Sequence, residues 1–156
     1  MSEYAALVTR INASLTDVEK SVLRVKELSE KANSTGDDGY WDGVALNLHG
    51  FYTGIEKIFE DIARTIEGSL PSGTEWHKDL LTQMAGGAEG IRPAVINHET
   101  RHCLDMYRGF RHLVRNVYTF NLRPTRIHEL ANDLPDCFQA ILQDLNAFMQ
   151  FLISLE

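Results

Sequence analysis

The helical spacing of apolar residues is the feature that most constrains how this chain can fold. In residues 4–33, apolar side chains recur three and four positions apart, a period that fits one face of an α-helix. These side chains are Val8, Ile11, Leu15, Val18, Val22 and Val25. No segment shows the sustained alternation of a half-buried β-strand. The sequence therefore predicts an all-α protein.

Turn-forming and capping residues divide the chain into four long helices and one short helix. The expected helices span residues 4–33, 40–68, 74–85, 97–120 and 125–155. Thr74 and Asn97 are the expected N-caps of the third and fourth helices, and Pro135 should kink the last helix or split off its opening turns. Without an internal repeat or a linker, residues 1–156 are predicted to form one domain, an up-and-down helical bundle.

Charge and composition narrow the functional classes. The chain has 15 Lys and Arg against 22 Asp and Glu, a formal net charge of -7, so a nucleic acid would have to bind a local basic strip. No apolar run approaches the roughly 18 residues of a membrane span, and the N-terminus lacks signal-peptide features. Cys103 and Cys137 form no Cys-x-x-Cys pair, so we expect buried free thiols in a cytoplasmic protein.

The densest basic strip lies on the fourth predicted helix. Arg108, Arg111 and Arg115 are followed by Tyr118 at a 3-4-3 spacing, which places them along one line of the helix surface. Neighbouring guanidinium groups repel each other by a few tenths of a kcal/mol per pair. A polyanion, or carboxylates from a neighbouring helix, would therefore have to stabilise this row of like charges. The expected apolar side of this helix consists of Cys103, Met106, Phe110, Leu113, Val114 and Val117, with Tyr107 and Tyr118 at the boundary.

Other polar residues accompany the strip. His112 and Asn116 share its face and add groups able to exchange a proton or hold a hydroxyl. On the second helix, Glu56 and Asp61 either form a solvated acidic face or approach the arginine strip, and His49 reads as a hydrogen-bonded histidine. The lone histidines without an expected role are His77 and His128.

One short segment matches the His-Glu-x-x-His signature of zinc proteases. His98 and His102 lie four residues apart on one helix face, and Glu99 could activate a metal-bound water. The extended signature needs a glycine and a third histidine, where this chain has Asp105 and Arg108. A zinc hydrolase is therefore the weakest of the functional readings, and no metal or other cofactor is expected.

The segment from Arg111 to Tyr118 resembles the Arg-x4-His-x-Tyr motif of HEPN-domain ribonucleases, in particular of HepT-like toxins. Residues 46–52 look like the family's second helix, and the length and helix order are also similar. The resemblance implies a small helical bundle that dimerises with its motif helices facing each other. It also implies metal-independent RNA cleavage through the 2′-hydroxyl, with a cyclic phosphate as product. A minimal nucleotidyltransferase would be the antitoxin and could attach AMP to the motif tyrosine.

Carried over to this chain, the resemblance makes Arg111 the residue that holds the scissile phosphate and Tyr118 the one modified with AMP. Arg108 and Arg115 would bind neighbouring RNA phosphates.

The motif histidine is replaced by Asn116, which can orient a hydroxyl but cannot exchange a proton near pH 7. His112 is then the candidate for proton transfer. Two readings stay open: an RNA endonuclease toxin using Arg111, His112, Asn116 and Tyr118, and a catalytically silent HEPN protein that binds RNA or nucleotide or docks a nucleotidyltransferase.

Overall fold

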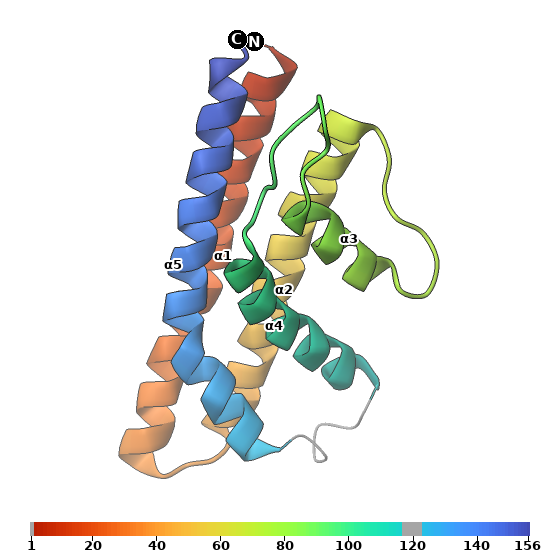
Figure 1. The fold of residues 1–156 in the computed structure, drawn as a ribbon. Coiled ribbons are helices and arrows are strands. Elements are labelled where there is room, and N and C mark those ends of the chain that lie inside the picture. Colours follow the sequence, from red (N-terminus) through yellow and green to blue (C-terminus); the bar gives the residue numbers. More distant parts are fainter. Residues whose placement is uncertain (1, 117–122) are drawn as a thin grey trace.

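The computed structural model describes residues 2–116 and 123–156, with the backbone alone at residues 115 and 116 (Figure 1). Its helices are α1 (Glu3–Thr35), α2 (Tyr40–Ile62), the π-helical turn η1 (Ala63–Glu67), α3 (Trp76–Ala85), α4 (His98–Asn116) and α5 (Pro124–Ser154). Within this described part of the chain there is no β-strand, and the predicted all-α class is confirmed. No helix in the same part is long and apolar enough to cross a membrane.

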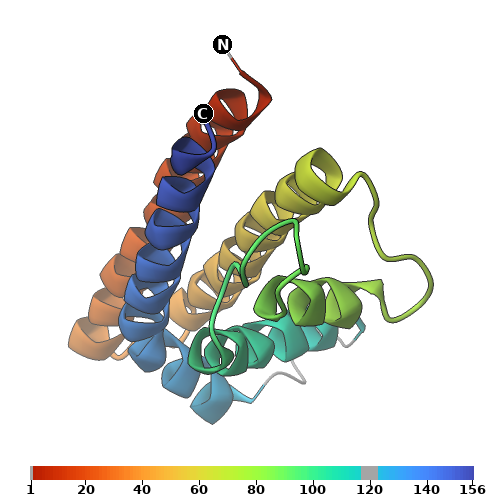
Figure 2. The ribbon, with the colours of Figure 1, turned by 45° about the horizontal axis from the view of Figure 1, so that its top comes forward.

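The helices pack around one hydrophobic core. The long helices α1 and α2 are antiparallel neighbours, and α5 lies along α1 so that the two ends of the chain meet (Figure 1). The shorter helices α3 and α4 lie across α2, on the side away from α1 (Figure 2). Gly36 ends α1 in the left-handed conformation at φ 72°, and the turn into α2 follows at once. This arrangement holds α4 against α2, α3 and α5.

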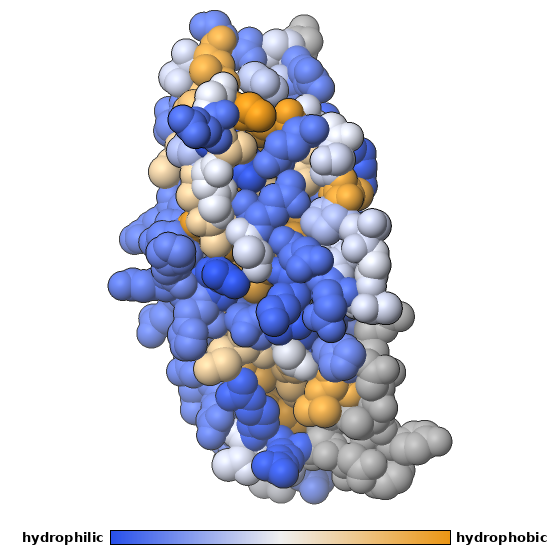
Figure 3. Space-filling view, turned by 45° about the vertical axis from the view of Figure 1, so that its right-hand side comes forward, coloured by the Kyte–Doolittle hydropathy of each residue, from blue (hydrophilic) through white to orange (hydrophobic). Residues whose placement is uncertain are grey.

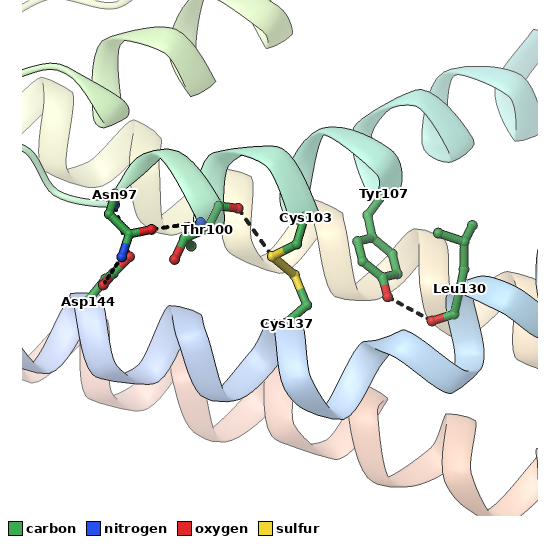
Figure 4. Close-up of a disulfide and its surroundings, with 7 residues drawn as sticks. All are labelled: Asn97, Thr100, Cys103, Tyr107, Leu130, Cys137 and Asp144. Carbon is green, nitrogen blue, oxygen red and sulfur yellow. Dashed lines mark hydrogen bonds between the residues drawn. A yellow bond between two sulfur atoms is a disulfide. The ribbon is translucent and has the colours of Figure 1, made fainter.

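Two predicted caps have different outcomes. The Asn97 side chain accepts a hydrogen bond of 2.8 Å from the Thr100 N–H, so Asn97 is the N-cap of α4 as predicted. Asp144 of α5 accepts a bond of 3.0 Å from the Asn97 backbone N–H and fixes this end of the helix (Figure 4). The prediction for Thr74 was wrong, because α3 begins at Trp76 and no side chain caps it.

Pro135 does not divide the last helix. Helix α5 is continuous from Pro124 to Ser154, and its first turns bend away from the axis of the remainder in Figure 1. A proline removes one backbone donor and clashes with the preceding turn, which bends a helix without ending it when tertiary packing holds both sides. The predicted kink is therefore present, and the predicted split is not.

A buried arginine organises the connection between α3 and α4. Arg92 donates to Glu67 Oε1 at 2.6 Å and to the carbonyl oxygens of Gly86, Pro93 and Gln83 at 2.7, 2.9 and 3.1 Å. Its side chain is only 1% exposed. Because backbone carbonyls and a carboxylate together satisfy the guanidinium, the irregular connection is held against η1 without a regular element of its own.

The expectation of two free thiols was wrong. Cys103 of α4 and Cys137 of α5 form a disulfide, with Cα atoms 5.9 Å apart (Figure 4). Both residues lie on the helix faces that pack against each other, a juxtaposition that depends on tertiary structure. No spacing within either segment signals it. The bond links the helix that carries the arginine strip directly to α5.

Candidate functional site

The orientation of α4 differs from the one that its apolar spacing predicts. Tyr107, expected at a boundary, is buried, and its hydroxyl donates to the Leu130 carbonyl at 2.7 Å (Figure 4). Met106 and Leu113, expected inside, are each 40% exposed. The reason is that α4 packs against both α2 and α5, which rotates its buried stripe toward Tyr107 and Phe110.

This rotation brings the first two arginines of the strip to the edge of the core. Arg108 is half-buried and donates to Asp105 Oδ1 at 2.8 Å. Arg111 is also half-buried, and its Nε donates to the Thr53 hydroxyl of α2 at 3.2 Å. A neutral hydroxyl positions the Arg111 guanidinium without neutralising it, so the group retains its charge for an anionic ligand.

Both arginines line a pocket of about 560 Å³ between α4 and the start of α3. The lining residues are Thr74, Glu75, Trp76, His77, Lys78, Arg108, Arg111 and His112. The surface on this side of the molecule is mostly hydrophilic (Figure 3). The pocket therefore combines three basic side chains, two imidazoles, one indole ring and the carboxylate of Glu75.

The contribution of α3 was missed at the sequence level. His77 Nδ1 lies 2.7 Å from the Oε2 atom of Glu56, and the His77 side chain is 26% exposed. Glu56 comes from α2 and is only 4% exposed. A usable signal did exist, because Glu56 interrupts an otherwise apolar helix face one turn after Tyr52. A carboxylate at such a position needs a polar partner.

The two acidic residues of α2 have separate roles. Asp61 accepts from Arg10 of α1 at 2.8 and 2.9 Å, so it does not approach the arginine strip. The hydrogen bond from Arg10 is the main cause that lowers the pKa of Asp61. Glu56 reaches the pocket through His77, and burial together with the Glu56 charge raises the pKa of the neighbouring Tyr52. The Tyr52 phenol therefore stays protonated at neutral pH.

A second hollow of about 280 Å³ lies between α3 and α4. Lys78 lines both, and Arg101 adds a further cation. His98 and His102 also line this hollow. Over the described ranges, 2–116 and 123–156, no group of three or more His, Cys, Asp or Glu side chains could hold a metal ion.

The remaining motif residues are placed only in part. Arg115 and Asn116 belong to the last turn of α4, and their side chains lie outside the described part of the structure. Tyr118 lies outside the described residues altogether. The structure thus brings Arg108, Arg111 and His112 together at one pocket.

Comparison with known proteins gives one match. Residues 43–152 match the model of a protein family described as HepT-like protein. This span is more than two thirds of the chain and contains every residue that lines the pocket. No curated protein and no solved structure matches the chain.

Proposed function

Because this chain belongs to the HepT-like protein family, we propose that it is a metal-independent RNA endonuclease toxin. The observation that supports this most directly is the pocket of about 560 Å³ in which Arg108 and Arg111 meet Lys78. Cations that converge on one hollow favour a phosphodiester, and the Trp76 ring at its edge offers a surface on which a base can stack. The pocket thus provides the local basic surface that a protein of net charge -7 needs in order to bind a nucleic acid.

Each side chain has a chemical role in the proposed reaction. Arg111 binds the non-bridging oxygens of the scissile phosphate and stabilises the charge that develops there. Arg108 and Arg115 bind adjacent phosphates, His112 transfers a proton, and Asn116 orients the 2′-hydroxyl. The 2′-oxygen bonds to phosphorus while the bond from phosphorus to the 5′-oxygen breaks. The products are a 2′,3′-cyclic phosphate and a 5′-hydroxyl.

The second hollow suggests where the next nucleotide lies. It shares Lys78 with the pocket and adds Arg101, whose guanidinium donates to the Thr82 hydroxyl at 3.1 Å. Because both hollows lie between α3 and α4 and share Lys78, we propose that a single RNA strand passes from one to the other. Such a strand would place successive phosphates near successive cations.

The proposed assembly is a homodimer regulated by a nucleotidyltransferase antitoxin, which attaches AMP to Tyr118. Met106 and Leu113, seven residues apart on one side of α4, are each 40% exposed and offer apolar surface to a second copy. Light scattering should report a dimer at micromolar concentration, and a monomer would contradict this assembly. A Tyr118→Phe variant should still cleave RNA but should not accept AMP from the partner.

The cleavage test uses single-stranded RNA in the presence of EDTA. Wild-type protein should release fragments that end in a 2′,3′-cyclic phosphate. His112→Ala should lose most of the activity, since general acid–base catalysis contributes about 10²–10⁴-fold. Arg111→Ala should also lose most of it, because removing one donor to the developing charge costs about 10²–10³-fold. Arg24→Ala is the matched control, because Arg24 is an arginine of α1 that pairs with Glu27 and lies outside the pocket.

A second candidate function is favoured by Asn116 alone. Without a titrating group at that position, the protein would bind RNA or nucleotide, or dock the nucleotidyltransferase, without cleaving. Absence of cleavage by wild type together with cleavage by Asn116→His would select this alternative.

A further inference from the structure

We propose that His77 is a catalytic residue of the RNA cleavage, and that Glu56 is its positioning residue. The inference rests on the proposed endonuclease function and adds a group from a different helix, outside the motif on α4. His77 takes the role of general base for the 2′-hydroxyl. It thereby supplies the proton transfer that Asn116 cannot perform.

The geometry around His77 fixes the ring at the pocket. Its Nδ1 atom lies 2.7 Å from the Glu56 carboxylate, and its ring packs against Trp76 with centroids 3.7 Å apart. An ionised carboxylate only accepts hydrogen bonds, so Nδ1 carries the hydrogen, and in the neutral imidazole Nε2 keeps its lone pair. A buried acidic group that orients an imidazole in this way prepares the opposite nitrogen to accept a proton.

Among the titratable groups around the Glu56–His77 pair, the Tyr52 phenol is poorly suited to this role. The Tyr52 phenol is buried and has a raised pKa, so it does not take up or release a proton at neutral pH. His112 belongs to α4, whereas His77 enters from α3, so the two imidazoles border one pocket from different helices. The charged and titratable groups that line the pocket or contact His77 are Glu56 of α2, Glu75, just before α3, Lys78 of α3, and Arg108, Arg111 and His112 of α4.

The two proton transfers of the proposed step are carried out by two histidines, His77 and His112. His77 Nε2 removes the proton of the 2′-hydroxyl as the 2′-oxygen bonds to phosphorus. The bond from phosphorus to the 5′-oxygen breaks, and protonated His112 gives that oxygen its proton. His77 then releases its proton to water and His112 regains one from water, which restores both side chains without an oxidant or a reductant.

The test is His77→Asn, because the asparagine amide nitrogen takes the place of Nδ1, so it can still donate to Glu56 and keep α3 in place but cannot exchange a proton. Cleavage of single-stranded RNA in EDTA should fall about 10²–10⁴-fold. Affinity for the same RNA with a 2′-deoxy nucleotide at the cleavage site, and the melting temperature, should stay near wild type. The acidic limb of the pH–rate profile, where the general base gains its proton, should flatten.

His128→Asn is the matched control, because His128 also stacks on a tryptophan, Trp41, with centroids 3.7 Å apart, and does not line the pocket. It should cleave at the wild-type rate. A folded His77→Asn variant that cleaves at the wild-type rate would refute the role of His77 and leave the endonuclease function standing. Wild-type protein that binds RNA without cleaving it would refute both.

Discussion

Reduction of the Cys103–Cys137 disulfide should lower the stability of the protein substantially. The bond joins residues 34 positions apart, α4 to α5. Closing a loop of that length removes chain entropy from the unfolded state that corresponds to about 3.8 kcal/mol at 25 °C in the loop-entropy model. For a chain of this size, each kcal/mol shifts the melting temperature by about 2–4 °C, so reduction should lower it by roughly 8–15 °C.

The measurement is thermal unfolding followed by far-UV circular dichroism, with and without a phosphine reductant. Cys103→Ser is the control, because it cannot form the bond and its melting temperature should not respond to the reductant. Equal melting temperatures for oxidised and reduced wild type would refute the argument, provided that thiol titration shows the bond before reduction. Detection of two free thiols in untreated protein would refute the disulfide itself.

Reduction should lower the stability of the protein but should change the geometry of the pocket little. Helix α4 is also held by the buried side chains of Tyr107 and Phe110, and by the Asn97 bonds to Asp144. At temperatures well below the melting point, the reduced protein should therefore keep the RNA affinity that we propose for the oxidised protein. A large loss of affinity on reduction would show that the disulfide itself positions Arg111.

Other consequences of the structure can be checked by unfolding experiments. Arg92→Met should destabilise the protein by about 3 kcal/mol, because it leaves the Glu67 carboxylate and the carbonyls of Gly86 and Pro93 without their donor. Restored stability when Glu67→Gln is added to Arg92→Met would confirm the cause. Gly54→Ala should destabilise it by about 1–3 kcal/mol in urea titration, since the added Cβ would lie 2.7 Å from a Val18 methyl group. The pKa of Asp61 is lowered in the folded state, so its stabilisation is present above the ordinary value of 3.8 and is lost as pH falls through the folded-state pKa. Asp61→Asn should therefore flatten the acid side of the stability curve, and an unchanged curve would contradict the ion pair.

The helices themselves were predictable because their signals are local. The apolar stripe of α1, the capping of α4 by Asn97 and the position of the arginine strip all depend on residues within a few turns of each other. Local periodicity and capping chemistry determine these features, and the tertiary packing of the helices is compatible with them.

The pocket could be predicted only in part, because five of its eight lining residues come from α3 and the turn before it. The spacing of Arg108 and Arg111 could be read from the sequence. The position of His77 at the pocket depends on how α3 crosses α2, which the sequence does not show. The orientation of α4 was misjudged for a similar reason. Its apolar residues cover more than one face, so contacts with α2 and α5 decide that Tyr107 is buried and Met106 exposed. The disulfide likewise depends on helix packing.

The glycines of α2 also limit where the chain tolerates insertions. Facing pairs across the first two helices are Gly43 with Leu28, Gly50 with Ser21, and Gly54 with Val18. One extra residue between Gly43 and Gly54 would rotate the rest of α2 by about 100°. It would place larger side chains where α1 leaves room for glycine, and it would turn Glu56 away from His77. Length variation in related chains should therefore occur in the connections at 36–39 and 68–75, and not within α2.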